Sequence, residues 1–162
     1  MIVLGVDPGL IKTGYGIIRA EGCNLLYLAS GTIFTNTKMP MENRLRDIFN
    51  ALSHLLTVHR PDYLSIEDTF VNKNPLSSLK LGQARGTAIL CAGLSGIEVF
   101  EYKPNTIKKS VTGIGKATKD QVGAMIKYIF PMAKLKTEDE ADALAIAICH
   151  ANNFRGAGHK LK

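Results

Sequence analysis

The segment that most constrains the fold is Ile2–Val6, a short run in which nearly every residue is apolar. A strand with one face in water alternates apolar and polar residues, whereas an almost wholly apolar run is expected of a strand covered on both faces. We therefore expect this strand to lie inside a sheet with helices on both sides. The turn sequence Asp7-Pro8-Gly9 ends it.

The rest of the chain alternates strand-like and helix-like segments. Residues 14–20 and 24–34 are close enough for antiparallel pairing across the turn Glu21-Gly22, and Pro40 opens a long helix that Pro61 stops. Further strands are expected at 63–66 and 97–102, and further helices at about 77–94, 118–130 and 137–153. The pattern predicts one α/β domain over residues 1–153, a mixed five-stranded sheet flanked by helices, with a short basic tail over 154–162.

Composition indicates an ordinary globular protein of the cytoplasm. Of the 162 residues, 46% are apolar and 21% charged, which argues against disorder. No apolar run approaches the ~20 residues that span a bilayer, and no secretory signal opens the chain, so no membrane association is expected. The three cysteines are far apart in apolar surroundings, which predicts reduced core residues in a cytoplasmic protein.

The net charge of +6 is unevenly distributed. Residues 73–136 carry eleven Lys or Arg against three Asp or Glu, whereas residues 137–153 carry four acids and no Lys or Arg. A basic stretch beside an acidic cluster suits an enzyme that grips a phosphate backbone and binds metal at one point. A merely solvated basic face is the other interpretation.

Two acids end apolar strands. Asp7 follows the first strand and Glu67 the fourth. Carboxylates are rarely buried unless they are paired or bound to metal. The positions of Asp7 and Glu67 therefore indicate a functional role. The structural alternatives are that Asp7 stabilises a turn and that Glu67 and its neighbour Asp68 form a solvated pair.

Two more acids, Asp139 and Asp142, begin the last helix three residues apart and therefore share one face. Acids in a first turn also favour the helix dipole, which is the alternative interpretation and the one we apply to Glu138 and Glu140. His150, two turns further on, is expected to be a helix-face or C-terminal charge residue.

Phosphodiester hydrolysis would employ such acids. Two Mg²⁺ ions about 3.5–4 Å apart can activate a water and neutralise the phosphate oxygens, and magnesium prefers oxygen ligands. Mn²⁺ is a possible substitute. The chain contains no HExxH and no Cys/His cluster at zinc spacing.

Five segments follow one another in fixed order over nearly the whole chain. They are the opening strand with Asp-Pro-Gly and TGYGII, IEDTF with VNKNP, LKLGQARG, GIGKATKDQV and DEADALAIA. Together they resemble the bacterial Holliday-junction resolvases of the RuvC family. The resemblance implies a ribonuclease-H-like fold, a homodimer, and Mg²⁺-dependent symmetrical nicking of two like-polarity strands at a four-way DNA junction in recombination and repair. It also implies partnership with a branch-migration helicase complex.

By position, Asp7, Glu67, Asp139 and Asp142 match the family's four metal-binding catalytic acids, and Glu138 offers a competing carboxylate. The resemblance further implies that Lys119 is catalytic and contacts DNA. It also gives DNA contacts to Phe70 and Lys108, and we expect Lys73, Lys109 and Lys116 to add affinity for DNA. Phe70 would stack on bases of the opened junction. The alternatives are a solvated surface charge for each lysine and an aromatic folded back onto the core for Phe70.

Two other classes share some of these features. A strand ending in Asp followed by TGYG also resembles the first phosphate-binding hairpin of actin-like and sugar-kinase-like ATPases, which need two lobes where 162 residues provide one. A junction-binding module without catalysis would have no need for all four acids.

Overall fold

The computed structural model describes residues 1–68, 74–154 and 159–160, which form one sheet with helices on both faces. The strand order is β3-β2-β1-β4-β5-β6. The strands are β1 (Ile2–Asp7), β2 (Lys12–Glu21), β3 (Asn24–Phe34), β4 (Tyr63–Glu67), β5 (Glu98–Tyr102) and β6 (His159–Lys160). β4 runs parallel to β1 and β5, and the other neighbours are antiparallel. The predicted mixed five-stranded sheet is confirmed, and two tail residues extend it as β6.

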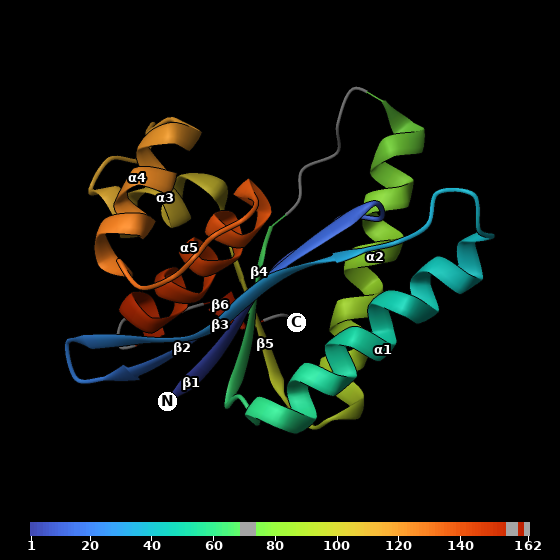
Figure 1. Ribbon diagram of the computed structural model, residues 1–162, viewed down its shortest axis with the longest axis horizontal. Helices are drawn as coiled ribbons and strands as arrows, with labels where there is room; N and C mark the ends of the chain where they lie inside the picture. Colours follow the sequence, from blue (N-terminus) through green and yellow to red (C-terminus); the bar gives the residue numbers. More distant parts are fainter. Residues whose placement is uncertain (69–73, 155–158, 161–162) are drawn as a thin grey trace.

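The helices lie in two groups. α1 (Met41–His59) and α2 (Pro75–Leu94) cover one face of the sheet, and α3 (Pro104–Thr112), α4 (Lys119–Ile129) and α5 (Glu138–Asn153) cover the other (Figure 1). Four of the five were predicted. α3 was missed, although Pro104 at its first position and Ile107 and Val111 one turn apart are helix signals. In the described part of the chain no helix is long and apolar enough to cross a membrane.

The strand β1 separates two hydrophobic cores. Its side chains alternate, so Val3 packs with α3, α4 and α5 while Leu4 packs with α1 and α2. Both residues are fully buried, as the apolar run predicted. The residues of β1 that follow keep this alternation, which decides the direction in which Asp7 points.

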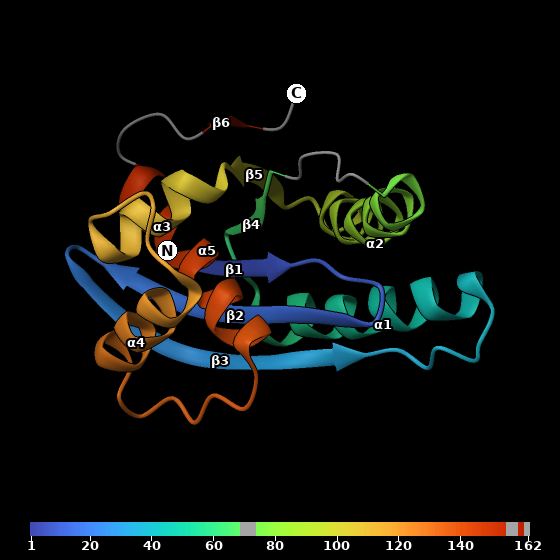
Figure 2. The ribbon, with the colours of Figure 1, turned by 90° about the horizontal axis from the view of Figure 1, so that it is seen from above.

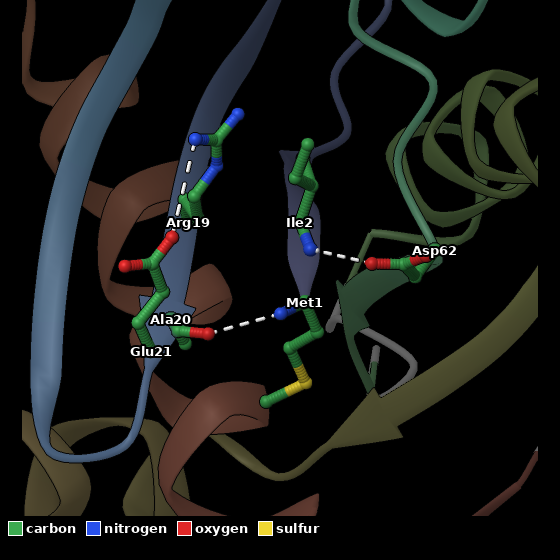
Figure 3. Close-up of polar contacts among 6 residues, drawn as sticks. All are labelled: Met1, Ile2, Arg19, Ala20, Glu21 and Asp62. Atoms are coloured by element: carbon green, nitrogen blue, oxygen red, sulfur yellow. Dashed lines mark hydrogen bonds and ion pairs between the residues drawn. The ribbon is translucent and has the colours of Figure 1, made fainter.

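The beginning of β1 is held from both sides. The Met1 ammonium donates to the carbonyl of Ala20 on β2 at 2.9 Å, and the Ile2 N–H donates to the Asp62 carboxylate at 2.6 Å (Figure 3). Asp62 directly precedes β4. These bonds fix the register of β1 against both neighbours at the end remote from Asp7.

Helix α5 lies directly on β1 and β2 (Figure 2). A Cβ atom placed on Gly5 would come within 2.1 Å of the Ala143 carbonyl oxygen, and one on Gly14 within 2.1 Å of the Asp139 carbonyl oxygen. One on Gly16 would meet the backbone nitrogen of Leu144 at 2.7 Å. No side chain fits at these three positions. Because the three glycines have none, α5 can come this close to the sheet.

Two expectations about single residues were wrong. His150 is not a helix-face charge, because it is fully buried and its Nδ1 lies 2.9 Å from the Tyr102 hydroxyl. Burial lowers the pKa of His150 to about 4, so the ring is neutral at pH 7. Cys91 and Cys149 are buried as predicted, but Cys23 is exposed.

Gly5→Ala tests the contact between α5 and β1. The added methyl group would overlap backbone atoms of α5, so we expect it to lower the free energy of unfolding by about 1–3 kcal/mol or more, measured by urea denaturation. Gly123→Ala on α4 is the control, because a Cβ there meets nothing within 4 Å. This control should raise stability by about 0.5–1 kcal/mol. Equal effects of the two substitutions would contradict the close-contact account.

Candidate active site

Asp7 and Glu67 lie side by side because they end adjacent parallel strands. Val6 pairs with Ile66 in register, and each acid is the next residue. Alternation points both side chains away from α1 and α2, since Val6 and Ile66 face those helices. The two carboxylates therefore meet on the α5 face, at the carboxyl ends of β1 and β4.

The first two turns of α5 bring Asp142 to this position and Asp139 near it. Thr137 caps the helix by accepting from the Glu140 N–H at 3.3 Å, and the first turn lies over β2. Asp142 lines a cavity of about 130 Å³ together with Asp7 and Glu67. Asp139 lies outside the lining of this cavity, but its charge acts on Asp7.

Burial and neighbouring acids raise the pKa values of the two strand acids. The pKa of Asp7 rises to about 7, first because the carboxyl is desolvated and then because Asp142, Glu67 and Asp139 repel its charge. Burial, then Asp142, also raises the pKa of Glu67. A divalent cation would relieve this repulsion, and every donor here is a hard oxygen of the kind that magnesium prefers. The residues thus fit such an ion, although no three acids, histidines or cysteines of the described part already form a metal site.

Two lysines complete the site. Lys119, the first residue of α4, donates to the Asp142 carboxylate at 3.2 Å, and this contact raises the pKa of Lys119. The predicted capping box between Thr118 and Gln121 fixes the helix end that carries it. Lys108, on α3, lines the same cavity, and its charge offsets part of the rise in the pKa of Glu67.

Other predicted site residues lie elsewhere. Lys109 is part of a separate groove between α3 and the end of α5, and Lys116 lies outside the acid cavity. Phe70 and Lys73 lie outside the described residues. Glu138, the competing carboxylate, lines an adjoining groove of about 510 Å³ and is not among the charges that raise the pKa of Asp7.

The sequence interpretation missed the role of Glu140. Only 4% of Glu140 is exposed, and its carboxylate accepts hydrogen bonds, so it does more than favour the helix dipole. The spacing Thr137-x-x-Glu140 is a capping-box signal that could have indicated a local bond. Nothing local in the sequence indicates its partner on β3, because 110 residues separate the two.

The acid cluster lies at the carboxyl ends of two adjacent parallel strands, beside an antiparallel hairpin, and the domain has the ribonuclease-H-like fold of the solved structures that it resembles. The family model described as crossover junction endodeoxyribonuclease RuvC matches residues 3–150. Relatives of the same description are 46% identical over 160 residues in Rhizobium etli and 49% over 155 residues in Methylorubrum populi. These matches cover 99% and 96% of this chain, and 94% and 82% of the relatives. The chain belongs to the RuvC family.

Solved structures agree with this assignment. The Thermus thermophilus RuvC in complex with a Holliday junction substrate is 29% identical, with a TM-score of 0.93 over 99% of both chains. The yeast mitochondrial Holliday junction resolvase Ydc2 has a TM-score of 0.63 at 14% identity and covers 93% of this chain and 78% of its own. Ydc2 therefore shares the fold.

Asp7→Asn should change the pH dependence of stability in the presence of a chelator. The pKa of Asp7 is about 7 when folded and is ordinarily 3.8, so the unfolded chain loses this proton first as pH rises. Stability therefore falls between about pH 4 and pH 7 and stays low above it. Without this carboxyl, we expect the Tm at pH 8 to rise by about 2–4 °C or more, and to change little near pH 4.

Asp47→Asn is the control for this measurement, because it removes an acid whose side chain is 47% exposed on α1. It should leave the pH dependence of the Tm unaltered. A Tm difference for Asp7→Asn that is the same at pH 4 and pH 8 would contradict the account of the acid cluster.

Proposed function

We propose that this protein resolves Holliday junctions, as a metal-dependent endonuclease that nicks two strands of like polarity symmetrically. The observation that carries the proposal is the cavity where Asp7, Glu67 and Asp142 meet Lys108 and Lys119. Family membership supplies the reaction class, and the similar Thermus thermophilus RuvC is seen in complex with a Holliday junction substrate.

The metal ligands in this proposal are Asp7, Glu67, Asp139 and Asp142. Bound Mg²⁺, with two ions per site and Mn²⁺ as a substitute, would activate the attacking water and neutralise charge on the phosphate. The raised pKa of Asp7 supports this assignment, because a cation in the cavity would return that carboxyl to its charged form. The acids would hold the ions in the cavity that Lys108 and Lys119 also line.

The lysines act on the DNA in this proposal. Lys119 is 72% exposed at its side chain and lies beside Asp142, so it can move from the carboxylate to a phosphate oxygen. Lys119 would thus stabilise charge as the bond breaks, and Lys108 would hold the backbone from the opposite helix. Outside the cavity, the proposal gives backbone contacts to three lysines and base stacking to one aromatic, namely Lys73, Lys109, Lys116 and Phe70.

The same proposal includes a homodimer, since a two-fold enzyme matches a near-two-fold junction with two cleavage positions. Helix α2 offers a surface for it. Leu79 and Leu90 are 61% and 57% exposed, and Gly82, Gly86 and Gly93 lie on the same helix face. A Cβ on any of these glycines meets nothing within 4 Å. A second copy of α2 could therefore approach closely and cover the leucines.

The proposal also places the protein in the cytoplasm, where bacterial chromosomal DNA lies, with a branch-migration helicase complex as its partner. Nucleotide hydrolysis by an actin-like ATPase and junction binding without catalysis are the competing functions. Both predict no strand cleavage, so a nuclease assay separates them from the proposal.

Asp7→Asn tests the proposed chemistry. The substitution removes a metal ligand but no DNA-binding lysine, so cleavage of a synthetic four-way junction should fall below detection while junction affinity stays within a few-fold. Cleavage is followed on labelled strands with and without Mg²⁺, and affinity by gel shift in Ca²⁺. The unmodified protein should cut the junction in Mg²⁺, should spare linear duplex of the same sequence, and should cut neither in chelator.

Two results would overturn the assignment. Efficient nicking by Asp7→Asn would remove this acid from the site, and equal cleavage of duplex and junction would remove the structure selectivity. Asp47→Asn should cut like the unmodified protein, because Asp47 lies exposed on α1.

Leu90→Asp tests the dimer surface. A charge placed on the exposed α2 face should raise the dimer dissociation constant at least tenfold in sedimentation measurements without DNA, because two copies would bring like charges together. Tyr128→Asp is the matched control, since Tyr128 is 83% exposed on α4 across the sheet. A dimer weakened by Tyr128→Asp and unaffected by Leu90→Asp would refute the choice of α2.

A further inference from the structure

We infer that Glu140 is a positioning residue for the acid cluster. It acts through a hydrogen bond that holds the first turn of α5 to the outer strand β3. The inference rests on the proposed function, in which Asp139 and Asp142 are metal ligands. Glu140 touches neither substrate nor metal in this account. It determines where the backbone that carries the two ligands lies.

The anchor lies where α5 crosses β2. Gly14 and Gly16 are the two residues of β2 beneath the first turns of α5, and their partners on β3 are Thr32 and Ser30. The Ser30 hydroxyl donates to Glu140 Oε2 at 2.8 Å. The Thr32 hydroxyl lies 2.6 Å from that of the N-cap residue Thr137. Two hydrogen bonds from β3 therefore hold the start of α5 across the strand on which it rests.

The Glu140 carboxylate is held by hydrogen bonds. Its Oε1 accepts from the Lys136 N–H at 3.3 Å and from the Thr137 hydroxyl at 3.4 Å. The Ser30 hydroxyl also lies 3.0 Å from that of Tyr27, which orients it. No basic side chain of residues 1–68 and 74–154 forms a salt bridge with Glu140. Because a carboxylate that is only 4% exposed is costly without such partners, these directional bonds confine the helix start to one position.

Helical geometry transmits this position to the ligands. Successive residues turn by about 100°, so Glu140 faces β3 while Asp139 and Asp142 share a different face of the same turn. Asp142 reaches the cavity with Asp7, and the Asp139 carbonyl rests against Gly14. A helix start released from β3 would move both aspartates together relative to Asp7 and Glu67, which belong to the sheet.

The experiment measures Mg²⁺ binding as well as cleavage. In Glu140→Ala, we expect the Mg²⁺ concentration for half-maximal junction cleavage, and the Mg²⁺ dissociation constant from calorimetry without DNA, to rise about tenfold. Amide hydrogen exchange at residues 138–142 should accelerate in parallel. Junction affinity in Ca²⁺ should change less than threefold, because no DNA-binding lysine is altered.

Three further variants complete the test. Glu140→Gln keeps an oxygen that can accept from Ser30, so it should recover most of the Mg²⁺ affinity and remains informative if Glu140→Ala unfolds. Ser30→Ala should raise the Mg²⁺ dissociation constant, and combining it with Glu140→Ala should add little to the effect of the latter. Glu42→Ala is the control, because Glu42 is an exposed first-turn glutamate of α1.

An unchanged Mg²⁺ dissociation constant in folded Glu140→Ala and in Ser30→Ala would overturn the inference. So would a loss of Mg²⁺ affinity in Glu140→Gln as large as that in Glu140→Ala. So would full additivity of Ser30→Ala and Glu140→Ala, since residues that act through one bond cannot be independent. Failure of the proposed function gives a different result, because the unmodified protein itself would then not cleave the junction.

Discussion

The contact between α5 and the glycines of β1 and β2 is the constraint on which the rest of the structure depends. Gly5, Gly14 and Gly16 leave the sheet surface bare, and backbone atoms of α5 occupy the space of three side chains. Because α5 lies so close to the sheet, the start of this helix reaches the ends of β1 and β4. A helix resting on ordinary side chains would stand further from the sheet, beyond the reach of Asp142 to Asp7.

This packing brings together carboxylates that repel one another. Desolvation and neighbouring acids raise the pKa of Asp7 to about 7, which means that the fold works against the charged form of its own site. Lys119 offsets part of this cost through Asp142, but only as an exposed side chain. The rest of the stabilisation of the folded state comes from the two hydrophobic cores on either side of β1 and from the hydrogen bonds that fix the start of this strand. Such a division between a costly site and a stable scaffold is common in enzymes.

Local sequence patterns predicted the architecture well, but they could not predict contacts between residues far apart in the sequence. The apolar run of β1, the hairpin after it and the spacing of four helices follow from period and turn chemistry. The short helix α3 was missed because its nine residues give little periodic signal. His150 was misassigned because its partner, Tyr102, lies 48 residues away, and the bond from Ser30 to Glu140 spans 110 residues. Pairings of this kind are set by the fold as a whole, and no window of sequence contains them.

The order of elements has a consequence for synthesis of the protein. The acids that line the cavity are far apart in the sequence, with Asp7 in β1 and Asp142 in α5. A chain still growing on the ribosome, or broken before residue 138, holds Asp7 and Glu67 without the helix that faces them. Because chains are made from the N-terminus, the site is completed only after α5 has been synthesised. An enzyme that cuts DNA would thus be inert in every form that lacks α5.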